Sequence, residues 1–461
     1  MRRSYKVKFI NDCDSVLNNE INSEIMKFDR NSFFNNIEEL PVLQNKVEMN
    51  SKTDLVIIGT GMVGITLAAR AWHLGFKGDR ITLIDGNEYF AENFFRRTKN
   101  SEQKIMRSSF IHHVAPNEDI NLADFTRLKH NELTNIEKEQ LTLARMGERS
   151  LPSLDIFLEH VKHVVINHNL HKRAFKFSAD SIEQNTTGKW IISDSEGQKI
   201  ESKYVVLAMG QSPKENMYKE HSINAHVDNF KNYLNEKVKT VNIIGGGNTS
   251  AHIVKSCLDR NLKVNWIIRN EENYACTDIP HKYWRDEGYL KFSQMTLDKR
   301  MEEIKRIYKG SAMLEHKGIF DDYKKDNALT VFDNATIQEI DKNKTIILQN
   351  KTRVESDLII STIGFELKKL PQIKNGINTF NGFPVLNDST LEAEGLKNLF
   401  IASSHSALSL GPAAKNIDGA RIASERIFKE LAKREGIEKY NVKNILENLT
   451  NWSRNTPVLK K

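Results

Sequence analysis

The most informative stretch of this chain reads Asp54-Leu55-Val56-Ile57-Ile58-Gly59-Thr60-Gly61-Met62-Val63-Gly64. An apolar run that enters a GxGxxG turn and then a helical segment is typical of a unit that binds a dinucleotide. A second apolar run, Ile81–Ile84, ends at Asp85, 21 residues beyond Gly64. An acidic residue at that place hydrogen-bonds a free ribose diol. We predict a dinucleotide site formed by Gly59, Gly61, Met62, Val63, Gly64 and Asp85.

A second stretch of the same kind reads Val241-Asn242-Ile243-Ile244-Gly245-Gly246-Gly247-Asn248-Thr249-Ser250. The apolar run that follows it, Val264–Ile268, ends at Arg269, 19 residues beyond Ser250. An arginine at this position suits a 2′-phosphate, whereas an acid suits a free ribose. The two stretches therefore predict one site for FAD and one for NADPH. The second site would consist of Gly245, Gly247, Asn248, Thr249, Ser250 and Arg269.

The alternative for both stretches is an ordinary βαβ unit with a tight turn and no ligand. A single GxGxxG pattern is weak evidence, because glycine-rich turns between strands and helices are common. Two such turns with the same context and spacing favour nucleotide binding over coincidence.

Length and composition fit a globular protein of two or three domains. The chain has 461 residues, of which 39% are hydrophobic and 28% charged, and it has no run of about 20 apolar residues that could cross a bilayer. The N-terminal segment 1–10 lacks the apolar core of a signal peptide. We therefore expect a cytoplasmic protein with no membrane span.

Cysteine usage and charge exclude two classes of protein. Cys13, Cys257 and Cys276 form no short-spaced pair, which argues against a disulfide framework and against dithiol–disulfide chemistry beside a flavin. The formal net charge is +7, yet acids and bases alternate in segments such as 299–306, as on a solvated helix face. We expect neither a nucleic-acid partner nor a metal ion.

Two further strands end in glycine and divide the chain. One runs from Tyr204 to Gly210 at the end of an expected meander over 174–207, and the other runs from Asp357 to Gly364. Residues 1–52 form an extension with one expected strand at Tyr5–Ile10. The predicted organisation is an N-terminal extension at 1–52, an FAD-binding part at 53–212, an NADPH-binding domain at 213–364, and a second FAD-binding part with a helical tail at 365–461.

This pattern resembles the two-dinucleotide-binding-domain flavoproteins, in which the NADPH domain is inserted into the FAD domain. The resemblance implies an α/β fold with two Rossmann-like domains, and it places Gly210 and Gly364 at the crossings between them. It also implies that the late strand Leu399–Ser404 and a helix opening at Gly411 lie along the flavin. Where the family usually has glycine-aspartate, this chain has two serines. The implied flavin contacts are Ser403, Ser404, Gly411 and Ala413.

Within that group the chain looks most like NADPH-dependent flavin monooxygenases, including the N-hydroxylating amine monooxygenases. The segment Met106–His113 resembles the family segment that runs past the flavin ring, and Arg149–Leu158 resembles its proline-containing turn into a helix. The resemblance implies that NADPH reduces FAD. The reduced flavin then forms a C4a-hydroperoxide with O₂, which hydroxylates a small nucleophilic, amine-like substrate.

The polar residues best suited to catalysis in this scheme are His112, His113 and His405, since an imidazole can donate a proton or bind a carboxylate. The stronger alternative for each of them is a surface or packing residue, because adjacent histidines point in different directions. The segment Tyr274–Trp284 could line a substrate channel or form a plain surface loop. Two other functions stay open: an NADPH–flavin reductase that passes electrons to a quinone, metal or protein, and a non-catalytic nucleotide-binding module. The sequence does not predict the oligomeric state.

Overall fold

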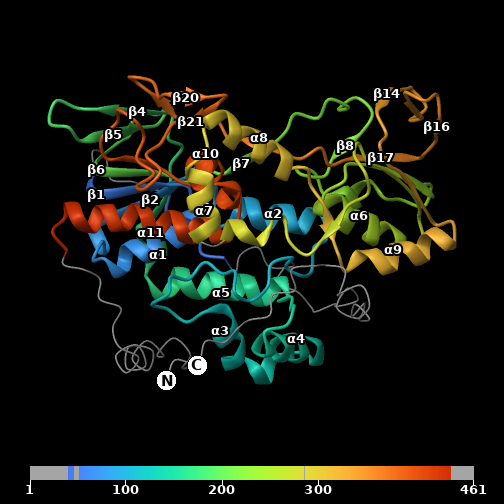
Figure 1. The fold of residues 1–461 in the computed structure, drawn as a ribbon, viewed down its shortest axis with the longest axis horizontal. Helices are drawn as coiled ribbons and strands as arrows, with labels where there is room; N and C mark the ends of the chain where they lie inside the picture. The colour runs from blue at the N-terminus through green and yellow to red at the C-terminus, as the bar shows by residue number, and fades with distance from the viewer. Residues whose placement is uncertain (1–39, 46–50, 285, 438–461) are drawn as a thin grey trace.

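The computed structural model describes residues 40–45, 51–284 and 286–437, so the strand expected at Tyr5–Ile10 lies outside the described residues. Two α/β units lie side by side (Figure 1). The larger unit contains a sheet of order β19-β4-β5-β6-β1-β2-β3 with β22 added beside β6, and the smaller one a sheet of order β13-β10-β9-β17-β8. The expected fold class of two Rossmann-like units is confirmed.

The centre of the first unit is a parallel sheet formed by segments far apart in the sequence. β1 lies between β2 and β6, β3 extends the sheet beside β2, and β22 joins the far side of β6. The helices α1, α11 and α5 lie below this sheet in Figure 1. The elements are β1 (Ser51–Ile58), α1 (Met62–His73), β2 (Ile81–Asp85), α5 (Leu154–Asn167), β3 (Ala174–Lys176), β6 (Lys199–Leu207), β22 (Leu399–Ile401) and α11 (Ile417–Arg434).

The meander expected over 174–207 is partly wrong. β4 (Ser181–Gln184), β5 (Trp190–Ser193) and the start of β6 are antiparallel neighbours, and the turns between them place Gly188 and Gly197 at positive φ. β3, however, pairs in parallel with β2 instead of joining the meander. A short apolar run carries no information about its partner, so the sequence could not separate these two edges of the sheet.

The second unit is a five-stranded parallel sheet around the second glycine loop. Trp266 and Phe320 are buried in its core, where their rings meet edge to face, and a small antiparallel sheet of β14, β15 and β16 is attached. Its elements are β8 (Ile223–Asn224), β9 (Thr240–Ile244), α6 (Asn248–Leu258), β10 (Lys263–Ile267), α9 (His316–Lys325), β13 (Leu329–Phe332), β14 (Ile337–Ile340), β15 (Ile346–Leu348), β16 (Arg353–Val354) and β17 (Leu358–Ser361).

A two-stranded ribbon carries the chain between the units. β7 (Gln211–Pro213) pairs in antiparallel fashion with β18 (Phe365–Leu367). These strands directly follow the two strand-and-glycine endings at Gly210 and Gly364. Ion pairs of Arg107 with Asp278 and of Arg149 with Glu315 also join the two parts, each with a shortest nitrogen–oxygen distance of 2.5 Å.

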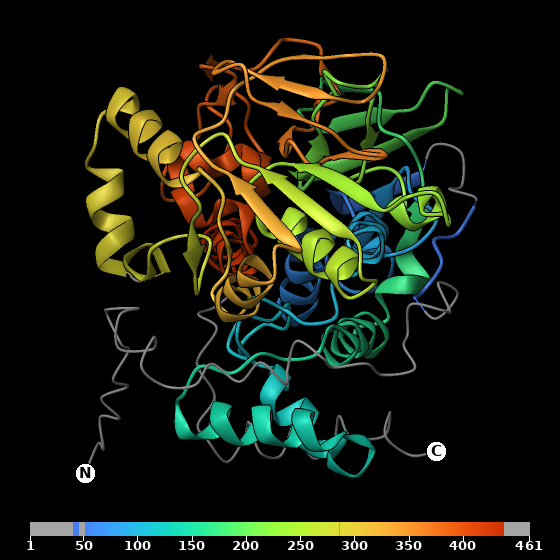
Figure 2. The ribbon, with the colours of Figure 1, turned by 90° about the vertical axis from the view of Figure 1, so that its right-hand side faces the viewer.

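One segment leaves the second unit and packs on the first. Between β11 (Tyr274–Ala275) and β12 (Ala312–Met313), the chain forms η9 (His281–Trp284), α7 (Asp286–Ser293) and α8 (Leu297–Ile307). Figures 1 and 2 show α7 and α8, in yellow, against the C-terminal part of the first unit. We call residues 276–311 the excursion. Its side chains Tyr283, Phe292, Met301 and Ile304 belong to the core of the first unit.

The excursion is fastened by a buried arginine on α8. The Arg300 guanidinium donates to both carboxylate oxygens of Asp388, at 2.8 and 2.7 Å, and to the Leu408 carbonyl at 2.9 Å. Residues 276–311, which the sequence assigns to the NADPH-binding domain, thus pack partly as a component of the other unit. Because these contacts span about 90 to 110 residues of sequence, no local pattern reveals them.

The remaining helices include one that corrects an expectation. α3 (Leu122–Leu128) and α4 (Asn135–Met146) precede Arg149. The helix expected to open at Gly411 begins later: Gly411 has a φ of +90°, a 3₁₀ turn covers Pro412–Lys415, and α11 begins at Ile417. Among the described residues, no helix is both long and apolar enough to cross a membrane.

The shorter elements that complete the first unit are α2 (Glu92–Asn100), β19 (Gln372–Ile373), β20 (Thr379–Phe380), β21 (Phe383–Pro384) and α10 (Ala407–Leu410).

Candidate functional site

The three glycines of the first loop have three different structural roles. Gly59 has a φ of +116°, and a Cβ there would lie 2.5 Å from the Ala208 carbonyl oxygen. A Cβ on Gly64 would lie 1.8 Å from the Gly59 carbonyl oxygen, because α1 packs directly on the loop. A Cβ on Gly61 would meet no atom of the described protein within 4 Å. The space in front of Gly61 is therefore open, as the close approach of a pyrophosphate to the backbone requires.

The start of α1 is suited to an anion. Gly61 is the N-cap, it provides no side-chain hydrogen bond, and the first turn from Met62 and Val63 contains no acidic residue. The unpaired N–H groups and the positive end of the helix dipole therefore face the loop without a competing anion from the first turn.

Asp85 is held in a fixed position at the end of β2. Its Oδ2 accepts hydrogen bonds from the Thr60 N–H at 2.8 Å and the Thr60 hydroxyl at 3.1 Å, and its Oδ1 accepts from the Asn87 side-chain amide at 2.8 Å. The residue is buried. These bonds keep the carboxylate in one orientation beside the glycine loop, where it can also accept from a ribose diol.

The second glycine loop has the same structure as the first, except that a serine occupies its third position. Gly245 has a φ of +128° and a Cβ there would lie 2.5 Å from the Thr362 carbonyl oxygen, whereas a Cβ on Gly247 would meet nothing within 4 Å. At the third position, Ser250 is buried and donates from its hydroxyl to the Gly247 carbonyl at 2.7 Å. Asn248 and Thr249 open α6 without a capping side chain or an acidic residue. This helix start also suits a pyrophosphate.

Arg269 lies two residues beyond β10 and is exposed. It forms no ion pair with another residue of the described chain. Its charge acts on Tyr218, where it opposes the rise in pKa that burial causes. A guanidinium without a carboxylate partner at this strand end can receive a 2′-phosphate.

The two crossing glycines are bonded to different partners. Gly210 has a φ of +69°, and its N–H donates to the hydroxyl of buried Ser403 at 3.2 Å. Gly364 has a φ of +92°, and its N–H donates to His226 Nε2 at 3.3 Å. Burial, with a smaller contribution from the Arg97 charge, lowers the pKa of His226 to about 4. At neutral pH His226 is therefore uncharged and can accept this bond.

The turn before α11 brings the predicted flavin contacts together. Ser403, Ser404, Gly411 and Ala413 are all buried. A Cβ on Gly419, in the first turn of α11, would lie 2.1 Å from the Ala413 carbonyl oxygen, so this turn lies directly on the start of the helix. Asn416 caps α11 without a side-chain hydrogen bond.

The three candidate catalytic histidines engage different elements. His112 Nδ1 forms a short ion pair with Asp418 in the first turn of α11, and its ring centroid lies 4.7 Å from that of Trp284 in the excursion. His113 is buried beside His160 of α5, and burial lowers its pKa to about 2. His405 donates from Nε2 to the Lys368 carbonyl at 2.8 Å. Only His112 contacts both the start of α11 and the excursion.

Sequence analysis missed a charged cluster where the excursion begins. The Arg107 guanidinium donates to Asp278 Oδ1 at 2.5 Å and to the Ser311 hydroxyl at 2.7 Å. The Lys415 ammonium lies 4.1 Å from the centroid of the Tyr308 ring, and burial lowers the pKa of this lysine. Arg107 and Asp278 fall in two segments that the sequence singled out, but their pairing across 171 positions has no local signal.

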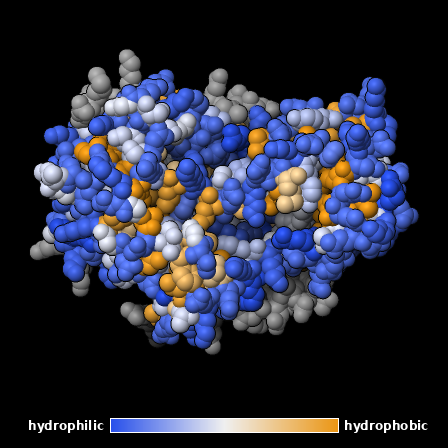
Figure 3. Space-filling model, turned by 90° about the horizontal axis from the view of Figure 1, so that it is seen from above, coloured by the Kyte–Doolittle hydropathy of each residue, from blue (hydrophilic) through white to orange (hydrophobic). Residues whose placement is uncertain are grey.

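The surface seen from above is mostly hydrophilic, with separate hydrophobic patches on both sides and in the middle, and it is hollowed near the middle (Figure 3).

Comparison with known families gives one match that covers most of the chain. Residues 53–405 match the pyridine nucleotide-disulphide oxidoreductase family. The chain belongs to this family, which confirms the expectation of an oxidoreductase that uses FAD and a pyridine nucleotide. Comparison of the sequence with curated proteins gives no match.

Three solved structures illustrate what the fold resembles. The FAD-bound cadaverine monooxygenase of desferrioxamine biosynthesis from Erwinia amylovora has 15% identity and a TM-score of 0.66, over 84% of this chain and 96% of that one. The ornithine N-hydroxylase from Kutzneria sp. 744 has 13% identity and a TM-score of 0.66, over 83% and 100%. The bacillithiol disulfide reductase from Staphylococcus aureus has 15% identity and a TM-score of 0.57, over 84% and 99%. At these identities the likeness concerns the fold.

Proposed function

We propose that this member of the family is an FAD- and NADPH-dependent monooxygenase that hydroxylates a small, amine-like nucleophile. The observation that carries the proposal is the pair of glycine loops. Each opens a helix without a capping side chain. The strand after the first helix ends at Asp85, and the strand after the second ends two residues before Arg269. The similarity in fold to the cadaverine and ornithine monooxygenases supports the same class of reaction.

In this proposal the chain's own residues bind, orient and shield. Gly61 and the start of α1 hold the FAD pyrophosphate, and Asp85 the adenosine ribose. Gly247 and Arg269 hold NADPH by its pyrophosphate and 2′-phosphate. When bound, the two cofactors supply hydride transfer and the activation of O₂. The excursion covers the first unit beside the start of α11, where His112 is held by Asp418, and so limits the access of water.

Thiol chemistry is disfavoured by the cysteines that the structure describes. Cys257 lies in the core of the second unit, and burial raises the pKa of its thiol to about 12. Neither Cys257 nor Cys276 forms a disulfide. Cys13 lies outside the described residues. A buried thiol of this pKa is a poor nucleophile, because the thiolate is the reactive form. A variant that lacks all three cysteines should therefore retain NADPH oxidation.

The decisive experiment separates oxygenation from electron transfer. Protein reconstituted with FAD is reduced by NADPH without oxygen, and O₂ is then admitted with and without an amine. Cadaverine and L-ornithine, which the solved relatives name, are the first amines to test. We expect hydrogen peroxide without amine, and with the correct amine less peroxide and a hydroxylamine product.

Two results would contradict the proposal. Reduction by NADPH that leads to no peroxide and no hydroxylated product, but to rapid reduction of a quinone, would assign the chain as a reductase. A protein that folds yet takes up no FAD would assign it as a non-catalytic module.

A further inference from the structure

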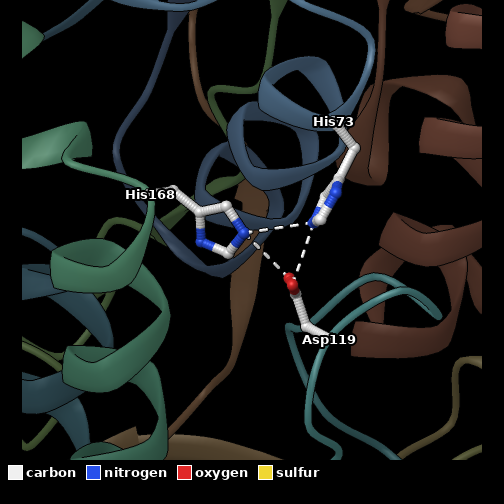
Figure 4. A group of neighbouring side chains, drawn as sticks. All are labelled: His73, Asp119 and His168. Carbon is white, nitrogen blue, oxygen red and sulfur yellow. Dashed lines mark hydrogen bonds and ion pairs between the residues drawn. The ribbon is translucent and has the colours of Figure 1, made fainter. Parts of the chain in front are cut away.

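Three side chains outside the nucleotide sites converge below the sheet of the first unit. They come from three elements: His73 is the last residue of α1, Asp119 lies in the loop before α3, and His168 is the residue that ends α5. His73 Nε2 lies 2.9 Å from Asp119 Oδ1, and His168 Nε2 lies 2.9 Å from Asp119 Oδ2. The two imidazole Nε2 atoms are 3.3 Å apart. Figure 4 shows all three groups pointing toward one another.

The orientation of His168 directs a lone pair into the cluster. Its Nδ1 lies 2.7 Å from the Val164 carbonyl oxygen, which can only accept, so the proton of the neutral ring belongs on Nδ1. In the neutral ring Nε2 is then an acceptor that faces another acceptor, Asp119 Oδ2, whereas a protonated ring would donate to it. The same arrangement, in which a backbone carbonyl fixes the tautomer, is usual for histidines that bind a metal.

Burial makes this convergence of acceptors costly without a cation. The side chains of His168 and Asp119 are 1% and 5% exposed, respectively, and that of His73 is 13% exposed. With a neutral His168 ring, a proton on His73 Nε2 is shared between Asp119 Oδ1 and His168 Nε2, so neither acceptor receives a full hydrogen bond. A buried carboxylate without sufficient partners is unfavourable by several kcal/mol.

We infer that His73, Asp119 and His168 form a site for a divalent transition-metal ion, with zinc as its preferred occupant. Two imidazole nitrogens and one carboxylate oxygen are ligands that zinc accepts, whereas magnesium and calcium require mostly oxygen. Ligand atoms about 2.0–2.1 Å from a tetrahedral zinc lie about 3.3 Å apart. The nitrogen–nitrogen separation has this value. The Asp119 carboxylate presents a different oxygen to each imidazole, at 2.9 Å, and would have to turn to offer one oxygen to the ion. A water molecule would occupy the fourth position.

The site lies away from the cofactor sites in this proposal. α1 runs from the pyrophosphate loop to His73 over 12 residues, about 18 Å, so the ion would lie far from the cofactor phosphates. It would join the ends of α1 and α5 to the loop before α3. The fluorescence of Trp72 should respond to metal binding, because its ring contacts the His73 and His168 rings edge to face at centroid distances of 5.2 and 5.1 Å.

The test uses the full chain with FAD bound and with any histidine tag removed. Zinc content is measured by mass spectrometry, and affinity by competition with a chromophoric chelator. We expect one zinc ion per chain and a change in Trp72 fluorescence on chelation. His168→Gln and Asp119→Asn should each weaken zinc binding at least about hundredfold. The matched control is His130→Gln, which alters an exposed histidine outside the cluster and should bind as the wild type does.

The FAD content of each variant checks that it has folded. Chelation should also lower the melting temperature of the wild type but not that of His168→Gln. Wild-type protein that binds zinc no better than His168→Gln would overturn the inference and leave a hydrogen-bonded His–Asp–His network. Because zinc is measured directly, this result is independent of whether the chain oxygenates an amine.

Discussion

The two nucleotide units contain the same kind of glycine loop. They differ in how closely the next helix packs on that loop and in how the residue at the end of the next strand is held. In the first, α1 lies so close to the loop that only glycine fits at position 64, and Asp85 is bonded to Thr60 and Asn87. In the second, Ser250 fits at the equivalent place, and Arg269 is exposed. The first site is thus preorganised by the fold, whereas the second depends on an exposed side chain.

This difference matches the demands that two such cofactors would make. A flavin that stays bound through many turnovers gains from a rigid site. A nicotinamide coenzyme that enters and leaves in each turnover requires affinity without slow release. Changes in the first loop should therefore affect folding and flavin content, and changes in the second should affect mainly coenzyme kinetics.

The largest effect is expected from exchanging the third residues of the two loops. Gly64→Ser would place a Cβ 1.8 Å from the Gly59 carbonyl oxygen, which should destabilise the fold by more than about 4 kcal/mol. Ser250→Gly removes one hydrogen bond and adds a glycine near a helix start, at about 1 kcal/mol. The yield of folded protein, its FAD content and its melting temperature measure both. A Gly64→Ser protein with normal FAD content would show that α1 does not pack on the loop as described.

The next prediction concerns variants that should fold but should no longer bind their cofactor normally. Because a Cβ at position 61 or 247 meets no protein atom within 4 Å, Gly61→Val and Gly247→Val should both fold. Gly61→Val should be purified without FAD. Gly247→Val should remain yellow and show a KM for NADPH raised at least about tenfold. Circular dichroism and flavin absorbance test these outcomes, and full flavin occupancy in Gly61→Val would contradict the assignment of the first loop.

The sequence was sufficient for features that depend on neighbouring residues. Both glycine loops, the strands that flank them and the strand endings at Gly210 and Gly364 follow from short-range rules about turns and apolar runs. The expected strand at Ile81–Asp85 is observed with those bounds. The functional roles of the cofactor and catalytic residues stay predictions.

Features that depend on distant contacts could not be predicted. The excursion packs on the first unit through Arg300 and Asp388, 88 positions apart, and the His73–His168 contact spans 95 positions. The helix expected at Gly411 begins at Ile417 because Gly411 adopts a positive φ before a 3₁₀ turn. Propensity along the chain contains no information on which distant side chains will meet.

The two crossings, at Gly210 and Gly364, should contribute differently to the loss of stability at low pH. His226 has a folded pKa of about 4, below the unfolded value of about 6.5, so the unfolded chain takes up a proton first as the pH falls. Its stabilising contribution is present above pH 6.5 and is lost toward pH 4, by about 2 kcal/mol at pH 5. In His226→Gln, urea unfolding should show a correspondingly smaller loss of stability between pH 7.5 and 5.

Ser403→Ala, at the other crossing, is the matched control, because it removes the acceptor for Gly210 N–H without removing a titratable group. Its effect on the free energy of unfolding should be the same at both pH values. If wild type and His226→Gln lose equal stability on acidification, His226 is not the source of the acid response at the second crossing.

The smallest effect concerns the open end of the second site, where Arg269 is exposed and has no carboxylate partner in the described chain. A charge-assisted hydrogen bond to a 2′-phosphate contributes about 1.5–3 kcal/mol, or about ten- to a hundredfold in affinity. Arg269→Ala should raise the KM for NADPH by this factor with little change in kcat, because the phosphate is remote from the hydride. The KM for NADH should stay unchanged, because NADH has no 2′-phosphate, and so should the FAD content. Lys263→Ala is the control, since Lys263 begins β10 at the opposite end of the strand, roughly 15–20 Å away. An equal loss for both coenzymes, or an equal effect of Lys263→Ala, would mean that Arg269 does not select NADPH and that only the first unit has a defined ligand.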